Sequence, residues 1–265
     1  MKLFVLNDNS PSGDFASEHG LSYFIEAAGQ KILFDVGPSM VFLKNAQKMG
    51  IDVDAADLVV LSHGHWDHTN GLAQTYRGKK LEGKPLLCHP NTFVRGYRLR
   101  DKKHHGAPIS REEAQAHFQL TESAKPYKIA DGIWFLGEIP RKNGFEQTKI
   151  LAKLEDGADD LLPDDTALAF VEAGKLHVIT GCSHSGIANI VAYAMQVTGC
   201  SNIATVMGGF HLSANDARTQ RTVDFFKANH VKRVIPSHCT KLPALAAFYD
   251  AFRFRQVTSG SVWEL

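Results

Sequence analysis

Cysteine is scarce in this 265-residue sequence, which contains four cysteines and no C-x-x-C pair. Four such cysteines do not make a disulfide framework for a chain of this length, so we expect a reducing compartment. An excess of charge of one sign is also lacking, because 29 Lys and Arg residues face 28 Asp and Glu residues. This balance leaves no electrostatic footprint for nucleic acid or for an anionic membrane surface.

Long hydrophobic runs are missing as well. No apolar segment approaches the length of a membrane span, and the N-terminal segment turns polar at Asn7 and Asp8, too early for a secretory signal. With 44% hydrophobic residues, the chain can nevertheless bury a large core. We therefore expect a cytoplasmic protein of one domain over residues 1–265, whose partner is a small molecule.

Three histidines and one aspartate lie within six residues, in the order H-x-H-x-D-H from His63 to His68. The apolar run 56–61 before them predicts a buried strand, and the residues after them predict a helix. Side chains held between two rigid elements are suited to metal coordination. From an extended turn, His63 and His65 can converge on one ion, whereas Asp67 and His68 point to a second. Imidazole and carboxylate ligands together suit zinc, iron or manganese better than calcium or magnesium.

Strand hairpins are predicted at two places in the chain, over 21–35 and over 166–180. Each hairpin is followed by strand–helix units, whose expected helices cover about 40–49, 187–196 and 216–229. A repeated succession of hairpins and strand–helix units implies two sheets packed together with helices outside. The expected fold class is therefore α/β.

Two charged segments are expected near the site. Residues 91–130, which include the basic run 102–106, are predicted to be partly helical and partly loop, and to form an insertion or cap over one edge of the site. The acidic stretch 142–165 is predicted to be a loop, either a mobile one beside the site or a solvated one on the surface. Glu138 and Arg141 follow a predicted strand, so they either line the cleft or form an ion pair.

Three further histidines, His184, His211 and His238, follow predicted strand ends, from which side chains can point into a common cleft. We predict that His184 binds metal, with a substrate contact or a supporting role as the alternative. His211 is interpreted as a ligand, an acid catalyst or a substrate clamp. The remaining histidines are given structural or surface roles, with a substrate-phosphate contact as the alternative for the pair at 104–105 and a contact with the site as the alternative for His89: His19, His89, His104, His105, His117, His177 and His230.

The H-x-H-x-D-H block resembles the signature of the metallo-β-lactamase superfamily. Further blocks extend the similarity over nearly the whole chain: LFDVG at 33–37, GEIPR at 137–141, GCSHSGI at 181–187, GGFHL at 208–212 and HCT at 238–240. Together they resemble metal-dependent hydrolases related to dihydropterin-(ribofuranosyl)aminobenzene 5′-phosphate synthase.

This resemblance implies an αββα sandwich of two mixed β-sheets with outer helices, and a metal site along one edge of the sheets. Zinc is the expected ion, with iron or manganese as alternatives. His238, on a late strand-end loop, becomes an expected ligand. The resemblance also points to a phosphorylated or pterin-like substrate.

Two positions depart from the pattern of the superfamily, in which the strand of a hairpin like 166–180 commonly ends in an aspartate that bridges two metal ions. Cys182 stands there instead, and either its thiolate or His184 supplies the ligand. The usual third-motif histidine is expected just before residue 166, where the sequence reads PDD at 163–165. The centre is therefore expected to hold one or two ions.

The leading hypothesis is a metal-dependent hydrolase that uses a metal-activated water on an ester-type small molecule, either a phosphoester or a lactone-like ester. One ion would be held by His63, His65 and His184, and the second by Asp67, His68 and His238. Asp67 would also orient the water, and His211 would protonate the leaving group or stabilise negative charge. The alternatives are a synthase acting on a phosphoribosyl or pterin-type substrate and a non-catalytic, metal-dependent binding protein.

Overall fold

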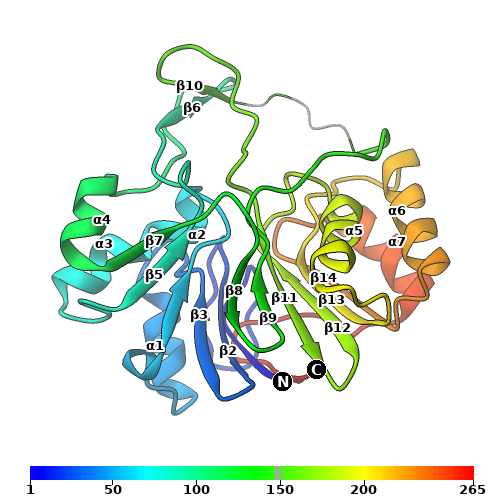
Figure 1. Ribbon diagram of the computed structural model, residues 1–265, viewed down its shortest axis with the longest axis horizontal. Helices are drawn as coiled ribbons and strands as arrows, with labels where there is room; N and C mark the ends of the chain where they lie inside the picture. The colour runs from blue at the N-terminus through cyan, green and yellow to red at the C-terminus, as the bar shows by residue number, and fades with distance from the viewer. Residues whose placement is uncertain (147–149, 151) are drawn as a thin grey trace.

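Two mixed β-sheets form the centre of the computed structural model, which describes residues 1–146, 150 and 152–265 (Figure 1). Among these residues the first sheet has seven strands, in the spatial order β15 (Val262–Glu264), β1 (Lys2–Asn7), β2 (Ser22–Ala27), β3 (Gln30–Phe34), β4 (Leu58–Val60), β5 (Pro85–Cys88) and β7 (Gln119–Glu122). Neighbours from β15 to β3 pair antiparallel, and β3, β4, β5 and β7 pair parallel.

The second sheet has six strands in the described ranges. Their spatial order is β14 (Arg233–Ser237), β13 (Ile203–Gly209), β12 (Lys175–Thr180), β11 (Ala167–Glu172), β9 (Ile133–Phe135) and β8 (Tyr127–Ala130). Strands β12, β13 and β14 pair parallel, whereas β8, β9, β11 and β12 pair antiparallel. Because parallel neighbours end at the same edge of a sheet, the loops after β12, β13 and β14 meet there.

Helices cover the outer face of each sheet (Figure 1). They are α1 (Val41–Lys48), α3 (Gly71–Arg77) and α4 (Arg111–His117) on the first sheet, and α5 (Ile187–Thr198), α6 (Ala217–Ala228) and α7 (Leu242–Phe252) on the second. Local sequence sets where some of them begin: Ser110 and Glu113 form a capping box at the start of α4, and Asp216 caps α6. These layers confirm the expected αββα sandwich.

Alternation along the strands places apolar side chains on both faces of each sheet. In β3, Ile32 and Phe34 point between the two sheets, while Leu33 faces the helices of the first sheet. In β12, Ile179 lies between the sheets and Val178 lies on the helix side. Strands buried on both faces are almost continuously apolar, which is why the two hairpins could be predicted.

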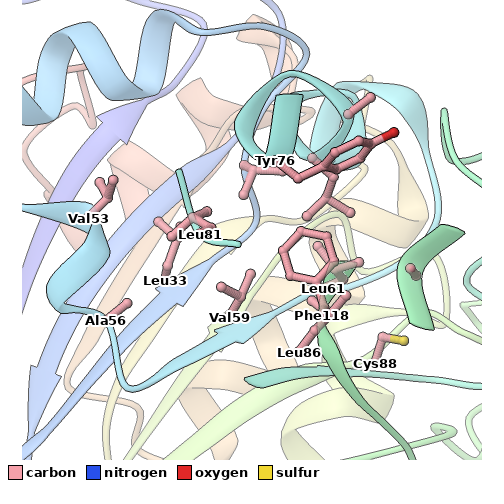
Figure 2. Close-up of a cluster of buried hydrophobic side chains, with 14 of the residues drawn as sticks. Leu33, Val53, Ala56, Val59, Leu61, Tyr76, Leu81, Leu86, Cys88 and Phe118 are labelled. Carbon is pink, nitrogen blue, oxygen red and sulfur yellow. The ribbon is translucent and has the colours of Figure 1, made fainter. Parts of the chain in front are cut away.

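The helix-side core of the first sheet surrounds the segment that leads into the H-x-H-x-D-H motif. Figure 2 shows Val59 and Leu61 of this segment beside Leu86 and Phe118, with Tyr76 of α3 above them. Each of these side chains is buried. This packing holds the backbone just before His63 in one position. A metal site needs such support, because its ligands must keep a precise geometry.

The segment 91–130 differs from its prediction. Part of it does form a projection: β6 (Gly96–Arg98) pairs with β10 (Ala152–Leu154) in a separate two-stranded sheet, which stands at the top of Figure 1. Farther along, β7 and β8 are outer strands of the two main sheets, where helix and loop were expected. Edge strands meet solvent along one side and carry polar residues such as Gln119 and Lys128, which obscures the strand pattern.

The acidic stretch 142–165, predicted as a loop, contains strand β10. Its residues 147–149 and 151 lie outside the described ranges. Across the ranges that the structure does describe, every helix is too short or too polar to cross a membrane.

Replacing Phe34 with alanine should test the inter-sheet core. Phe34 is fully buried between the sheets, so its truncation should lower the free energy of unfolding by about 3–5 kcal/mol. Urea denaturation with a chelator present would measure this without a contribution from metal binding. Leu242→Ala is the control, because that side chain is 77% exposed and should cost less than about 0.5 kcal/mol. Equal losses in the two variants would contradict the layered core.

Candidate metal centre

The predicted site residues meet at one edge of the sandwich, beyond the carboxyl ends of several strands. The motif that begins at His63 follows β4, and Cys182 and His184 follow β12. His211 follows β13, and His238 follows β14. The two sheets therefore each supply part of one cluster.

The two sheets approach each other closely at Gly181. A Cβ atom there would lie 2.1 Å from Ser62 Oγ and 3.3 Å from Asp35 Oδ2, so only glycine allows this contact. The backbone N–H of Thr166 also donates to the carbonyl of Ser62 at 2.9 Å. This close contact brings Cys182 of the second sheet next to the motif of the first.

One group of donor atoms spans the two sheets. The ligand atoms of His63, Cys182 and His184 lie within 4.8 Å of one another. His65 joins them, because its Nδ1 is 3.0 Å from His63 Nε2 and its ring centroid is 4.7 Å from that of His184. Burial lowers the pKa of His63 and His184 well below the ordinary value, and that of His65 to about 3. The three imidazoles are therefore neutral at pH 7, the form in which histidine binds metal.

A second group of donor atoms lies around Asp67, which is in the first turn of the short helix α2 (Trp66–Thr69). His68 Nε2 is 3.1 Å from His238 Nε2, and Asp67 Oδ2 is 3.5 Å from the same atom. Burial opposes ionisation of Asp67, but the neighbouring imidazoles outweigh it and hold the pKa of this carboxyl far below its usual range. Burial likewise opposes the charge on His238, but the hydrogen bond to Asp67 raises its pKa to about 9. The group therefore attracts positive charge, as a cation site must.

Cys182 belongs to both groups. Its Sγ lies within 4.8 Å of ligand atoms of His63 and His184 on one side and of His68 and His238 on the other. The sequence left open whether Cys182 or His184 replaces the bridging aspartate, and the structure brings both side chains to the centre. Burial raises the pKa of the Cys182 thiol, so a nearby cation is needed to form its thiolate at neutral pH.

Hydrogen bonds to the outer ring nitrogens orient two of the imidazoles. Asp35 Oδ2 lies 2.7 Å from His68 Nδ1 and accepts a hydrogen bond from Ser62 Oγ at the same distance. Ser62 Oγ is in turn 2.9 Å from His63 Nδ1. Because Asp35 and Ser62 act as acceptors here, both Nδ1 atoms carry the proton and both Nε2 atoms present a lone pair to the centre.

A third-motif histidine was expected near residues 163–165. Asp164 and Asp165 stand there instead and accept hydrogen bonds from the backbone of two loops of the centre. Asp164 Oδ2 accepts a hydrogen bond from the Gly64 N–H at 2.7 Å, and Asp165 Oδ2 accepts one from the Ser185 N–H at 2.8 Å. Both carboxyl groups are buried, and burial raises the pKa of Asp164 to about 7. These residues position backbone next to the predicted ligands.

Four residues of the centre hold left-handed backbone conformations. The φ angle is 59° at Asp35, 56° at Ser183, 50° at His211 and 48° at His238. Such conformations cost free energy for residues other than glycine and persist where the surrounding structure imposes them. At His211 the turn directs the ring toward His184, and the two ring centroids are 4.4 Å apart.

Two histidines to which the sequence assigned structural or surface roles lie at the centre instead. His19 Nε2 is 3.2 Å from Asp67 Oδ2, and the ring of His105 is 4.9 Å from that of His65. His19 precedes β2, whose amino end lies at the site edge because β2 runs antiparallel to β3. Considering strand starts as well as strand ends would have found it. His105 follows His104, which forms an isolated bridge with Tyr97 of β6. The pairing of β6 with β10 joins segments far apart in the chain, so the local sequence does not predict it.

A cavity of about 400 Å³ opens beside His65. Its polar lining includes Glu138, Arg141, Asp160 and Asp164, and the apolar lining comes from Val94, Leu154 and the segments 139–140 and 161–163. Glu138 and Arg141 therefore line the cleft, which was one of their two predicted roles. A cavity of this size accepts a small molecule.

Asp35→Asn should weaken metal binding without unfolding the chain. Asparagine keeps the size and tolerates the left-handed backbone, but its NH2 group replaces an acceptor oxygen that His68 and Ser62 use. We expect metal affinity to fall roughly 10- to 100-fold, measured by competition with a chromophoric chelator. Asp224→Asn on the exposed side of α6 serves as the control. Unchanged affinity in Asp35→Asn would show that this carboxylate does not orient the ligands.

Comparisons with known proteins identify the family of the chain. The family model of the metallo-β-lactamase superfamily matches residues 18–189. An uncharacterized protein of Methanocaldococcus jannaschii is 34% identical over 249 residues, which cover 91% of each chain. The 7,8-dihydropterin-6-methyl-4-(β-D-ribofuranosyl)-aminobenzene-5′-phosphate synthase of the same organism is 32% identical and covers 96% of this chain and 91% of that protein.

Among solved structures, Tm1679, a metal-dependent hydrolase of the β-lactamase superfamily, matches with a TM-score of 0.87 and 31% identity, covering 100% of this chain and 99% of that one. The family model thus covers residues 18–189, and the similarity to these relatives extends over nearly the full length of the chain. The chain belongs to the metallo-β-lactamase superfamily.

Proposed function

We propose that this protein is a hydrolase that holds two divalent ions, zinc by preference, and cleaves an ester-type bond in a small molecule. The observation that carries the proposal is the convergence of imidazole nitrogens on Cys182 Sγ from two sides. The donor set of neutral imidazole, thiolate and carboxylate favours zinc, with iron or manganese as alternatives.

Each side chain of the centre has a role in this proposal. The first ion is assigned to His63, His65 and His184, the second to Asp67, His68 and His238, and Cys182 is available to both. Bound ions supply an acidified water and polarise the scissile carbonyl or phosphoryl group. Asp67 accepts a hydrogen bond from the attacking water and orients it. His211, beside His184, protonates the leaving group or stabilises its negative charge.

Positive charge in a second cavity, beside the metal motif, supports a phosphorylated substrate. This cavity, of about 480 Å³, lies beside Trp66 of the metal motif and is lined by Arg95, Arg98, Lys103 and His104. Arg98 is paired with Asp101, but the lining still carries an excess of positive charge. Such a surface suits the phosphate group of a phosphoester. A lactone-like ester, which lacks that group, would use only the cavity beside His65.

A synthase is the second candidate, because a relative that covers most of the chain bears a synthase name. In that case the centre would bind the diphosphate of a phosphoribosyl-type donor. The bond from the sugar carbon to that diphosphate would break as the carbon–carbon bond forms, and the acceptor carbon would give up its proton or its carboxylate. Incubation with such a donor and an aminobenzoate or pterin acceptor, followed by mass analysis, separates the two reactions. A condensed product favours the synthase, and products that have gained water favour the hydrolase. Neither product, with tight metal binding, favours a binding protein.

Asp67→Ala should remove most turnover while the fold survives. The change deletes a predicted ligand that also orients the attacking water, so the rate on a responsive phosphoester or lactone should fall roughly 10²- to 10⁴-fold. The circular dichroism spectrum should stay that of the unmodified protein. Asp224→Ala, at an exposed position, is the matched control. Activity near that of the unmodified protein would exclude Asp67 from the catalytic centre.

Metal content should distinguish a two-ion centre from a simpler one. Protein purified without added metal should contain two ions per chain by elemental analysis, and His184→Ala should contain one. His230→Asn, an exposed histidine change in a backbone conformation that asparagine tolerates, should retain both ions. A single ion that His184→Ala leaves in place would remove His184 from the ligands and favour the binding-protein alternative.

A further inference from the structure

Asn9, two residues after the end of β1, contacts two imidazoles of the metal centre at once. Its Oδ1 is 3.0 Å from His238 Nδ1, and its Nδ2 donates to the His238 carbonyl at 3.1 Å. The same Nδ2 lies 3.1 Å from Nδ1 of His19. Oδ1 also accepts a hydrogen bond from the Gly20 N–H at 3.2 Å. All the polar atoms of the amide are thus engaged.

These contacts determine which nitrogen of His19 carries the proton. The amide of Asn9 cannot be reversed, because its NH2 group would then face the Gly20 N–H, another donor. Its NH2 group therefore points to His19 Nδ1, which must accept. In neutral His19 the proton is then on Nε2, the atom that lies 3.2 Å from Asp67 Oδ2. His19 is a hydrogen-bond donor to Asp67, although its Nε2 lies close enough to Asp67 and His238 to be mistaken for a third ligand.

The loop that carries His19 is fastened to the metal motif by its backbone. The Leu21 N–H donates to the Asp67 carbonyl at 3.2 Å. A Cβ atom on Gly20 would lie 2.4 Å from that carbonyl oxygen, so glycine is needed for the loop to come this near. Asn7 and Glu18 also exchange hydrogen bonds across the base of the loop, at 3.3 Å each. The His19 ring is therefore positioned by the fold, even though 48% of the side chain is exposed.

We propose that His19 is a positioning residue that holds the carboxylate of Asp67 and thereby strengthens binding of the second ion. The inference rests on the proposed function only in that Asp67 belongs to the second-ion group. His19 stands at the solvent edge of this group, while the side chain of Asp67 is 8% exposed and that of His238 is fully buried. The oxygen that His19 contacts, Oδ2, also lies 3.5 Å from His238 Nε2 and 3.8 Å from His68 Nε2, so this hydrogen bond holds the carboxylate in place beside the other two predicted ligands.

The first test compares His19→Ala with His19→Gln in protein loaded with zinc. Chelator competition would measure the affinities of the two ions separately. His19→Ala should weaken the second ion roughly 10- to 100-fold and leave the first unchanged, the range typical for residues that support a ligand. His19→Gln, whose amide can donate in place of Nε2–H, should recover part of the loss. His230→Asn should match the unmodified protein.

The outcomes separate this inference from the proposed function. Two ions in the unmodified protein with unaltered affinities in His19→Ala would overturn the inference and leave the two-ion centre intact. Loss of both ions equally in His19→Ala, without recovery in His19→Gln, would also overturn it, because the change would then be structural. Fewer than two ions in the unmodified protein would contradict the proposed centre.

A nitrogen-15 NMR spectrum of the zinc-loaded protein provides a readout that is independent of ion counting. The histidine side-chain shifts should show His19 with its proton on Nε2 and an unprotonated Nδ1. The opposite tautomer, or two protons on the ring with Asn9 turned away, would overturn the inference whatever the number of ions bound. Asn9→Ala should weaken the tautomer preference, because the donor to Nδ1 is gone while Asp67 still accepts from Nε2.

Discussion

The centre depends on one buried carboxylate, that of Asp35. A charged group without access to water is costly unless hydrogen-bond donors surround it, and here the donors are the Ser62 N–H, the Ser62 hydroxyl and the His68 ring, each at 2.7 Å. Those donors belong to the motif that supplies predicted ligands. The hydrogen bonds to Asp35, which follows β3, therefore hold the segment after β4 in place. The bond from His68 also fixes the orientation of its ring.

Burial has two effects at this edge of the sandwich. It lowers the pKa of His63, His65 and His184, so these imidazoles are neutral and keep a lone pair that can bind metal. It also makes a collection of such lone pairs unfavourable without a cation, because the lone pairs face one another at short range. Folding of the two sheets and metal binding are therefore linked, since each lowers the cost of the other. Gly181 is the point at which the sheets come close enough for this linkage.

Much of this arrangement could be predicted from sequence, for reasons that are local. The strand before His63 is apolar and buried on both sides, and the ligands that follow it are adjacent in the chain. His184, His211 and His238 could be placed because each comes directly after a strand. His19 was missed because it precedes a strand, and only the antiparallel pairing of β2 with β3 brings the amino end of β2 to the site edge. The edge strands β7 and β8 were missed because solvent on one side allows polar residues in them.

The pairing of β15 with β1 has a consequence for how the protein acquires its site during synthesis. These strands lie side by side, with Lys2 opposite Glu264, although nearly the whole chain separates them. Asn9 lies two residues after β1 and contacts His238. The N–H of the neighbouring Asp8 donates a hydrogen bond to the hydroxyl of Ser259. Strand β1 can therefore be paired on both sides only after strand β15 has been synthesised. The hydrogen bond between Asp8 and Ser259 can form only then, so the position of Asn9 beside His238 depends on two strands from opposite ends of the sequence.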